Sequence, residues 1–338
     1  MDIKLNHQTS SCKSSTQLET FIPISMIGEG KFAKVLLCRH KITGKHYAMK
    51  ILSKQYTKKR QYQGRVFQEK NALISCKSNQ FITNLHYTFQ TSSKLFLILD
   101  YCPGGDLFNF LQKKVFFNES EARFYISQIV LALEFLHNNS IIYRDLKPEN
   151  ILIDKNGYIR LADFGYSKQH MDDNVTTNSF CGTFQYMAPE FILKKAHGKP
   201  VDIWALGCLI YELITGNPPF YDFNQKILFD FILYKEPDLQ TKKISNYLKD
   251  LLKKLLEKKQ EYRINIQEVK SHPWLSSCNW NEISQQSQKA FYIPQVKKAS
   301  DISNFDKKYS CIDVNAIIFD EEDGDDILHL DDFSCDSL

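Results

Sequence analysis

The chain has 338 residues, 43% of them hydrophobic, which is long enough to bury a large core in one bilobal unit or two domains. Its formal net charge is +4, but ten acidic residues and no Lys or Arg lie from Asp313 onward, so residues 1–312 carry 43 basic against 29 acidic side chains. This segregation favours docking of an acidic end on a basic body over nucleic-acid binding, and the chain contains no DNA- or RNA-binding motif.

No run approaches the roughly 18 consecutive apolar residues of a membrane span. The first residues lack both the apolar region of a signal peptide and the glycine required for myristoylation. Nine cysteines are scattered without a Cys-x-x-Cys pair, which argues against a zinc cluster or a disulfide framework. We therefore expect a cytoplasmic protein with reduced thiols, for which access to the nucleus is left open.

Residues 1–20 are rich in Ser, Thr, Gln and Lys, and this composition predicts a disordered segment. Three apolar runs follow and predict three strands, one ending at Met26, one over 35–38 and one over 47–52. The turn between the first two contains Gly28 and Gly30, whose backbone can approach phosphate groups closely and donate amide hydrogens to them. Taken alone, this turn is equally typical of an ordinary hairpin.

A helical pattern of apolar residues covers 63–76, and two further strands are predicted over 82–90 and 94–99. The cluster of Pro and Gly within 100–106 then predicts a break between two parts of the fold. From Asn118, with Glu121 placed to complete a capping box, the pattern predicts a helix to about Asn138 whose apolar stripe belongs to the core.

Two motifs follow this helix, Tyr-Arg-Asp-Leu-Lys-Pro-Glu-Asn over 143–150 and Asp-Phe-Gly over 163–165. Phosphoryl transfer requires an oriented hydroxyl, a metal held by hard oxygen ligands and neutralised phosphate charge, and these motifs carry suitable groups. Together, in this order and spacing, they resemble the catalytic loop and metal-binding motif of protein kinases. The Lys-Pro-Glu-Asn sequence resembles the serine/threonine branch of that family.

The resemblance implies an α+β bilobal kinase fold, with a small antiparallel β-sheet N-lobe carrying the C-helix and a larger, mainly helical C-lobe. The kinase domain is expected over 21–275, with the N-lobe at 21–99, the hinge at 100–105 and the C-lobe at 106–275. Residues 276–338 are expected to form a C-terminal tail of the AGC type with an acidic end.

The resemblance also implies the catalytic roles and the cofactors, ATP and Mg²⁺. Asp145 is expected to accept the proton of the substrate hydroxyl, and Lys147 to contact the transferring phosphate. Asn150 and Asp163 are the expected ligands of Mg²⁺. A pseudokinase scaffold is the alternative from another class of protein, and it is disfavoured because the expected functional residues are all present, namely Lys50, Glu69, Asp145, Asn150 and Asp163.

In the N-lobe the resemblance implies a Gly-rich loop over the phosphates and a Lys50–Glu69 ion pair, although a solvated helix charge is the alternative for Glu69. Ala33 replaces the third glycine of the family pattern, and Leu99 is expected beside the adenine. The expected nucleotide contacts are Ile27, Gly28, Glu29, Gly30, Lys31, Phe32, Ala33, Lys34, Val35, Lys50, Glu69, Asp100, Cys102 and Asp106.

The segment from Tyr166 to Glu190 contains Ser-Phe-Cys-Gly-Thr over 179–183, which resembles the activation-loop signature of the AGC group. This resemblance implies phosphorylation of Ser179, with Arg65, Arg144 and Lys168 as counter-charges. An unmodified loop serine is the alternative. The chain departs from the family at Phe184, which stands where the usual sequence has proline.

Further along, Asp202-Ile-Trp-Ala-Leu-Gly resembles the F-helix of kinases, and Arg263 is expected to pair with Glu190 in a structural role. Glu149 and Glu212 correspond to acidic positions that bind substrate arginines in basophilic AGC kinases. We therefore expect an Arg-x-x-Ser/Thr preference.

The tail carries Phe-Tyr-Ile-Pro over 291–294 and Phe305, which resemble the AGC segment that wraps back toward the nucleotide site. Its end, Leu330 to Cys335, resembles a hydrophobic motif with Ser334 as a phosphorylation site, although Leu330 and Cys335 depart from the aromatic residues of that motif. An acidic disordered tail is the alternative.

The combined features resemble serum- and glucocorticoid-regulated kinase and protein kinase B. A catalytic subunit of the cyclic-AMP-dependent type, held by a regulatory partner, is the alternative within the class. The expected partners are protein substrates with Ser or Thr acceptors and an upstream activating kinase, with no nucleic acid, no transmembrane segment and a monomeric state.

Overall fold

The computed structural model describes residues 17–30, 33–57, 60–169, 184–240, 244–309, 312–319, 330 and 333–335. The chain divides into two compact units, and each is described by itself. The described residues of 1–70, 84–103 and 296–338 belong to the first, and those of 71–83 and 104–295 to the second. The predicted contacts Lys31 and Phe32 and the predicted phosphosite Ser179 lie outside the described residues.

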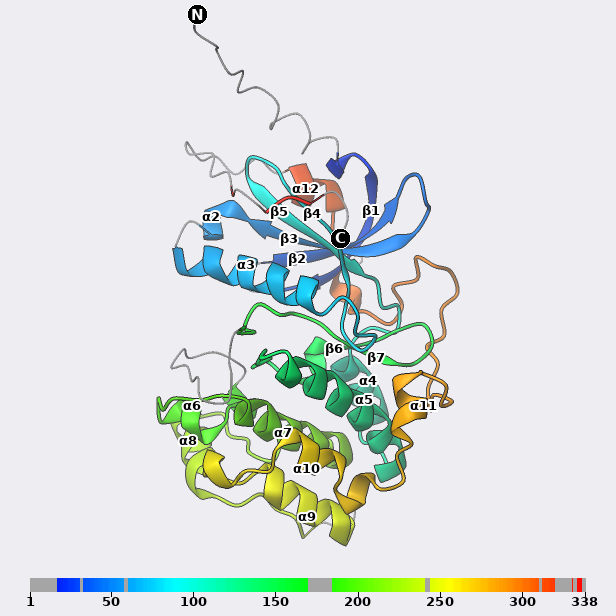
Figure 1. Ribbon diagram of the computed structural model, residues 1–338. Helices are drawn as coiled ribbons and strands as arrows, with labels where there is room; N and C mark the ends of the chain where they lie inside the picture. The colour runs from blue at the N-terminus through cyan, green and yellow to red at the C-terminus, as the bar shows by residue number, and fades with distance from the viewer. Residues whose placement is uncertain are drawn as a thin grey trace, which may run out of the picture. The chain divides into compact units, whose positions relative to one another are not determined.

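The first unit is built on one antiparallel sheet with the strand order β1-β2-β3-β5-β4 (Figure 1). Its strands are β1 (Phe21–Glu29), β2 (Ala33–His40), β3 (His46–Ser53), β4 (Leu85–Gln90) and β5 (Lys94–Asp100). The short helix α2 (Lys54–Thr57) follows β3, and α3 (Arg60–Ser75) continues from the first unit into the second. The strand predicted over 82–90 is observed as β4, which begins only at Leu85. Ile82 makes an isolated bridge outside the named strands.

One face of this sheet is covered by residues from both ends of the chain. Leu18 packs against the cluster that includes Phe21 and Phe89, so the end of the segment predicted to be disordered has tertiary contacts. The tail helix α12 (Val314–Phe319), orange-red in Figure 1, adds Ile317 and Ile318 to the same cluster. The Lys94 ammonium donates to the Ile318 carbonyl oxygen at 3.2 Å, which fixes the end of α12 on β5.

The second unit is mainly helical and contains one small sheet, β6 (Ile151–Ile153) paired with β7 (Ile159–Leu161). Its helices are α4 (Leu107–Lys114), α5 (Glu119–Asn138), α6 (Pro189–Ile192), α7 (Pro200–Thr215), α8 (Gln225–Tyr234), α9 (Asn246–Leu255), α10 (Ile266–Lys270) and α11 (Trp280–Ser284). The short 3₁₀ helices of this unit are η1 (Pro148–Asn150), η2 (Phe184–Tyr186), η3 (Gln260–Tyr262) and η4 (Pro273–Leu275), and η5 (Lys307–Tyr309) belongs to the first unit.

Two helices form the centre of the second unit. The predicted capping box at the start of α5 is confirmed, since Asn118 accepts from the Glu121 amide at 3.0 Å and Glu121 accepts from the Asn118 amide at 3.1 Å. Helix α7 is buried on nearly all sides. A Cβ atom on Gly207 would come within 2.9 Å of Leu255, which explains why only glycine allows α7 and α9 to pack this closely.

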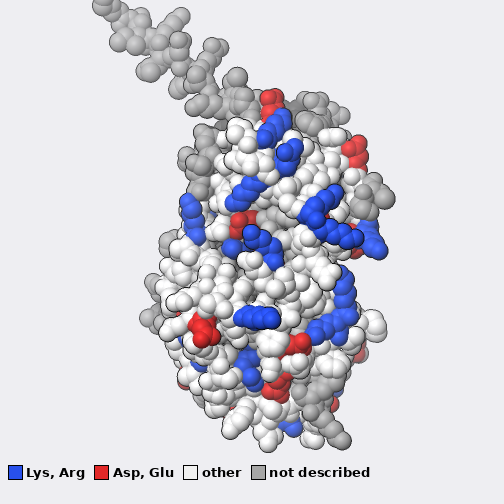
Figure 2. Space-filling model, turned by 90° about the vertical axis from the view of Figure 1, so that its right-hand side faces the viewer, with Lys and Arg blue, Asp and Glu red and all other residues white. Residues whose placement is uncertain are grey.

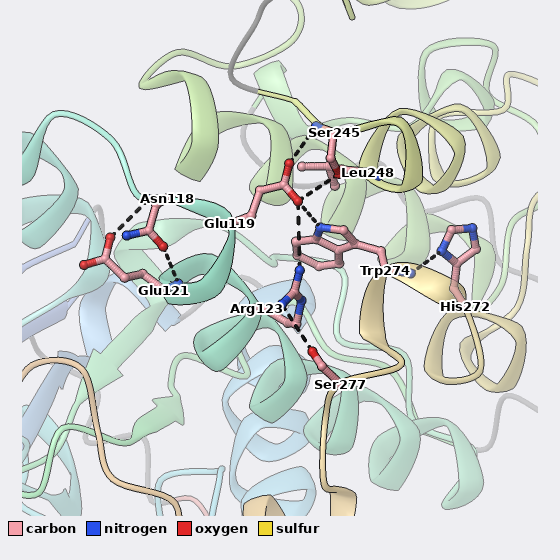
Figure 3. A network of polar contacts seen from close by, with 9 residues as sticks. All are labelled: Asn118, Glu119, Glu121, Arg123, Ser245, Leu248, His272, Trp274 and Ser277. Atoms are coloured by element: carbon pink, nitrogen blue, oxygen red, sulfur yellow. Dashed lines mark hydrogen bonds and ion pairs between the residues drawn. The ribbon is translucent and has the colours of Figure 1, made fainter.

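A polar network ties the start of α5 to two distant elements (Figure 3). The Glu119 carboxylate accepts from the Ser245 amide at 2.6 Å, from the Ser245 hydroxyl at 2.9 Å and from the Trp274 indole at 2.8 Å. The Arg123 guanidinium lies over the Trp274 ring and donates to Ser277 at 3.2 Å. One carboxylate thus fixes α5, the N-terminus of α9 and η4 in relation to one another.

Basic side chains predominate on one face of the described residues (Figure 2). On the face drawn in Figure 2, blue Lys and Arg side chains cover more of the surface than red Asp and Glu side chains. Within the described part of the chain, no helix combines the length and the hydropathy that a membrane crossing requires.

Candidate active site

Three polar residues of the second unit gather at the loop that leads into β6. The Lys147 ammonium lies 2.9 Å from Asp145 Oδ2. The Asn150 amide nitrogen donates to Asp145 Oδ2 at 2.7 Å and to the Asp145 carbonyl oxygen at 2.9 Å. The turn that brings Asn150 back toward Asp145 is η1, which begins with Pro148, a residue whose fixed φ suits the first position of a helix. Sequence positions 145, 147 and 150 thus form one cluster.

This loop is held by a carboxylate on α7. Asp202 accepts from the Tyr143 amide at 3.0 Å and from the Arg144 amide at 2.8 Å, and it lies 2.8 Å from His137 Nε2. Arg144 has a φ of 66°, a conformation that is costly for a residue with a Cβ. Because Asp202 is fully buried and binds both amides, it stabilises this strained backbone and thereby sets the position of Asp145.

Burial makes Asp145 a stronger base than an exposed aspartate. Its side chain is nearly buried, and desolvation raises its pKa, with the charge of Asp163 adding to the rise and Lys147 partly offsetting it. Burial alone would lower the pKa of Lys147, but the charge of Asp145 and the hydrogen bond to it raise that pKa overall. The pair therefore holds a basic carboxylate beside a permanent positive charge.

The oxygen atoms of Asn150 and Asp163 suit a magnesium ion, which prefers hard oxygen ligands. Because Asn150 donates its amide nitrogen to Asp145, its Oδ1 is the atom left for a metal. Asp163 has a φ of 53° and accepts from the Gly165 amide at 3.3 Å. The charge of Asp163 also raises the pKa values of Asp145 and Lys147, so these three residues belong to one charged group.

In the first unit, the predicted ion pair is present. Lys50 Nζ on β3 lies 2.6 Å from Glu69 Oε1 on α3, and both side chains are largely buried, at 12% and 4% exposed. Glu69 is therefore no solvated helix charge, which was the alternative. The pair holds the Lys50 ammonium in a fixed position, as binding of phosphate oxygens requires.

The Gly-rich segment is the turn between β1 and β2, where Gly28 pairs with Val35 and Glu29 with Lys34. The Gly30 amide donates to the Ala33 carbonyl oxygen at 2.7 Å, and this closes the turn. Behind it, an apolar cluster of the first unit contains Ile27, Val35, Leu37, Ala48, Leu99, Tyr101, Ile302 and Phe305. The cluster has the apolar character that an adenine ring requires.

Three other residues that are predicted to contact the nucleotide are buried or form hydrogen bonds within the protein. The Asp100 carboxylate accepts from the Asn84 amide at 3.0 Å and lies 2.8 Å from His86 Nε2, so its side chain has a structural role. Cys102 is buried. In the second unit, Asp106 caps α4 by accepting from the Asn109 amide at 2.7 Å. Whether these residues contact a nucleotide stays a prediction.

A group of coupled acidic residues lies in the second unit. Tyr186 donates a hydrogen bond to Glu212. Burial raises the pKa of Glu212, and the charge of Glu149 raises it further. The pKa of Glu149, an exposed residue, is also raised, by partial desolvation and by the charges of Asp145 and Asp106. Because these carboxylates repel one another, a bound cation would relieve their repulsion.

Two of the expected counter-charges for Ser179 lie side by side in the same unit. Arg144 Nε donates to the Tyr166 carbonyl oxygen at 2.7 Å, while Lys168 pairs with Ile142 through two backbone hydrogen bonds of 2.9 Å. Arg65 lies on α3, in the first unit. Phosphorylation of Ser179 stays a prediction.

The end of the tail adds to the exposed edge of the sheet in the first unit. The Cys335 amide donates to the Thr88 carbonyl oxygen at 2.7 Å, and the Phe333 carbonyl oxygen accepts from Thr88 Oγ1 at 2.6 Å and from Lys70 Nζ at 2.9 Å. The Phe333 ring is fully buried and packs edge-on against Phe67 of α3. The hydrophobic anchor expected from the sequence is therefore docked, and the disordered alternative is wrong for these residues.

Gln90 fixes the same segment from β4. It donates to the Leu330 carbonyl oxygen at 2.8 Å and accepts from the Leu330 amide at 3.1 Å. Lys54 Nζ donates to Gln90 at 2.8 Å, and Ser334 Oγ lies 3.5 Å from the Gln90 amide nitrogen. Burial lowers the pKa of Lys54 to about 8. Sequence reasoning missed Gln90, because one glutamine on a strand carries no signal of its distant partner.

The closing part of the tail has two further anchors. In the first unit, Phe305 stacks on Tyr101 with ring centroids 5.9 Å apart, and the Asn304 amide nitrogen donates to the Pro103 carbonyl oxygen at 3.0 Å. In the second unit, Tyr292 stacks on Phe110 at 4.3 Å. The predicted tail segments are thus anchored to the unit to which each belongs.

Comparison with known proteins agrees with this geometry. The model of the protein kinase domain family matches residues 21–275. The serine/threonine-protein kinase sgk-1 of Caenorhabditis elegans is 41% identical over 295 residues, which cover 86% of this chain and 64% of the relative. Sgk1 of Rattus norvegicus is 41% identical over 291 residues, 85% of this chain and 67% of its own length. The chain thus spans about two thirds of the length of these relatives.

Proposed function

Because the chain belongs to the protein kinase family, we propose that it is a serine/threonine kinase that transfers the γ-phosphate of ATP, with Mg²⁺, to protein substrates. The observation that carries this proposal is the cluster in which Lys147 and Asn150 both contact Asp145. The cluster joins a base of raised pKa to a positive charge and an oriented amide oxygen.

The mechanism follows from these side chains. Asp145 orients the substrate hydroxyl and accepts its proton, and Lys147 stabilises negative charge that develops on the transferring phosphoryl group. Lys50, fixed by Glu69, binds the nucleotide phosphates. Asn150 Oδ1 and the Asp163 carboxylate would hold Mg²⁺, which supplies neutralisation of phosphate charge.

Nucleotide binding tests this proposal against a scaffold without ATP affinity. With ATP and Mg²⁺ at 100 times the dissociation constant, the folded chain should gain about 2.7 kcal/mol of stability, seen as a raised Tm. Lys50→Met should lose most of this gain, since the phosphates lose their fixed ammonium. A wild-type chain whose Tm is the same with and without Mg²⁺ and ATP would contradict the proposal.

We further propose a preference for arginine before the acceptor, supported by the coupled carboxylates of Glu149 and Glu212. Glu149→Gln should raise KM for an Arg-x-x-Ser peptide by about 10- to 150-fold, equivalent to about 1.5–3 kcal/mol for a charged hydrogen bond. KM for the same peptide with alanine in place of arginine should not change. The matched control is Glu134→Gln, which replaces a partly buried carboxylate that pairs with Lys270.

The raised pKa values of Glu149 and Glu212 add a dependence on pH. As the pH falls through these values the carboxylates become neutral, so discrimination between the two peptides should shrink at acidic pH. If the ratio of KM for the alanine peptide to KM for the arginine peptide is the same in wild type and in Glu149→Gln, this carboxylate is not the arginine site.

We propose two regulatory phosphorylations by an upstream kinase, one at Ser179 and one at Ser334. A phosphate on Ser334 would lie near Lys54, and it would strengthen docking of the tail by pairing with a buried ammonium. Docking supports α3, because Phe333 contacts both Phe67 and Lys70 on that helix. Glu69, the partner of Lys50, lies between these two residues in the sequence.

Removal of the anchor tests the tail proposal. Phe333→Ala should remove about 3–5 kcal/mol of packing free energy and so detach the segment. Hydrogen exchange should then show loss of protection at the Thr88 and Cys335 amides, and kinase activity should fall. The control is Phe223→Ala, since Phe223 is 95% exposed and its loss should change stability by no more than about 0.5 kcal/mol. Retained protection in Phe333→Ala would contradict the proposal.

A further inference from the structure

The short tail helix α12 is attached to the sheet of the first unit by apolar side chains. Ile317 and Ile318 are 7% and 6% exposed, and they lie in one cluster with aromatic rings of β1, β4 and β5. Val314, the first residue of the helix, packs against the same cluster. Release of α12 would bring two buried isoleucine side chains into water and uncover part of this cluster, which is unfavourable.

A polar contact fixes the same helix to the sheet. Lys94 is buried at the start of β5, and its ammonium donates to the Ile318 carbonyl oxygen at 3.2 Å. This carbonyl lies in the last turn of α12, where carbonyl groups lack partners within the helix. Just before α12, Tyr309 of η5 packs against the apolar cluster as well. These contacts join apolar groups to one another and an ammonium to a carbonyl, so none of them requires a phosphate.

The docked end of the tail, Leu330 and 333–335, is bound close to this anchor. Gln90, which holds Leu330, and Lys94, which holds α12, stand at the two ends of the turn that joins β4 to β5. Ten residues of the sequence separate Phe319, the last residue of α12, from Leu330. A chain of this length reaches at most about 40 Å. While α12 is bound, the docked end therefore stays at an effective concentration on the order of millimolar or higher.

We propose that α12 is an anchor that lets the end of the tail dock without a phosphate, by keeping it beside β4 and α3 as an intramolecular ligand. Without α12, the last described anchor before Leu330 is Tyr309, and the connecting chain lengthens from ten to twenty residues. The effective concentration of the docked end then falls about threefold for a flexible chain and about sevenfold for an extended one. The inference concerns attachment of the tail and does not depend on kinase activity.

The test is hydrogen exchange of the full chain after phosphatase treatment, with loss of phosphate confirmed by intact mass. The amides of Leu330, Cys335 and Thr88 report docking, because each donates across the contact between the tail and β4. The double variant Ile317→Ala with Ile318→Ala should raise their exchange rates by at least about threefold, since the undocked state becomes more populated. Unchanged rates would overturn the proposal.

Two controls distinguish loss of the anchor from damage to the sheet. Leu18→Ala removes an apolar side chain from the same cluster but leaves α12 intact, so exchange of the tail amides should equal that of wild type. Asn315→Ala changes an exposed residue of α12 and should also leave these rates unchanged. A rise in Leu18→Ala as large as in the double variant would contradict the proposal, because the effect would then come from the sheet.

A second variant lengthens the connection without altering the cluster. Insertion of ten Gly and Ser residues after Gly324 places twenty residues between Phe319 and Leu330, the same length that loss of α12 leaves after Tyr309. The exchange rates of the tail amides should rise about threefold, as for a flexible chain. This variant decides the matter if the double variant fails to fold. Equal rates in the insertion variant and in wild type would overturn the proposal.

Discussion

Asp145→Asn is expected to lower kcat by about 10²- to 10⁴-fold, the usual contribution of a general base, while the fold is retained. The asparagine amide is nearly the same size as the carboxylate and can still accept from Asn150, so the loop should keep its shape. It cannot accept the proton of a substrate hydroxyl, nor does it present a negative charge to Lys147. Steady-state phosphorylation of a serine peptide measures the effect, and binding of ATP and Mg²⁺ by thermal shift should persist.

The matched control is Asp154→Asn. Asp154 is another buried aspartate of the second unit, whose carboxylate accepts from the Asn156 amide at 2.8 Å and the Tyr158 amide at 3.0 Å. Asparagine can make the same two hydrogen bonds, so this variant should retain activity within a few fold. An equal loss in both variants would attribute the effect of Asp145→Asn to stability and contradict its role as a base.

The same assignment predicts an acidic limit to activity. Since burial raises the pKa of Asp145, the carboxylate becomes protonated at a higher pH than an exposed aspartate would. Protonation removes the base, so kcat should fall as the pH decreases through that value. The residual kcat of Asp145→Asn should not fall in this way as the pH decreases.

Arg263→Met is expected to lower the free energy of unfolding by about 3–5 kcal/mol, because it leaves a buried carboxylate without its partner. Arg263 donates to both oxygens of Glu190, at 2.7 and 3.0 Å, and the two side chains are 0% and 3% exposed. It also donates to the Pro200 carbonyl oxygen at 2.8 Å, so the start of α7 loses a contact as well. Urea unfolding of both proteins measures the difference.

An exposed ion pair gives the control for this prediction. Lys254 lies 2.7 Å from Asp250, with side chains 49% and 53% exposed, so Lys254→Met should cost no more than about 1 kcal/mol. The double variant Glu190→Leu with Arg263→Met should regain part of the stability, since no unpaired charge remains. A loss in Arg263→Met no larger than that in Lys254→Met would contradict the importance of the buried pair.

The catalytic cluster was predictable from the sequence because its members lie close together in the chain. Asp145, Lys147 and Asn150 lie within six consecutive positions, so a short motif specifies both their chemistry and the turn that joins them. Lys50 and Glu69 are 19 residues apart, but the helical and strand patterns place each on its element, and the ion pair follows.

Other features could not be predicted, because they depend on contacts between segments far apart in the sequence. Asp202 binds the amides of Tyr143 and Arg144 across almost 60 positions, and no local pattern encodes that distance. The Glu119 carboxylate likewise binds Ser245 and Trp274, which lie 126 and 155 positions further along the chain.

The end of the tail shows why departures from a motif can mislead. Leu330 and Cys335 replaced expected aromatic residues, and this left a disordered tail as an equal alternative. At these two positions the docked segment is held by backbone groups, through the hydrogen bonds of Cys335 with Thr88 and of Leu330 with Gln90. Because backbone pairing with a sheet edge does not depend on side-chain identity, the segment tolerates these replacements.

The most direct test of the central claim is transfer of labelled phosphate from ATP to an arginine-directed peptide that contains serine, threonine and tyrosine, with Mg²⁺ and with a chelator. The account predicts that the wild-type chain forms phosphoserine or phosphothreonine and no phosphotyrosine, and only when Mg²⁺ is present. Absence of transfer by the wild-type chain with Mg²⁺, or label found on tyrosine, would contradict it.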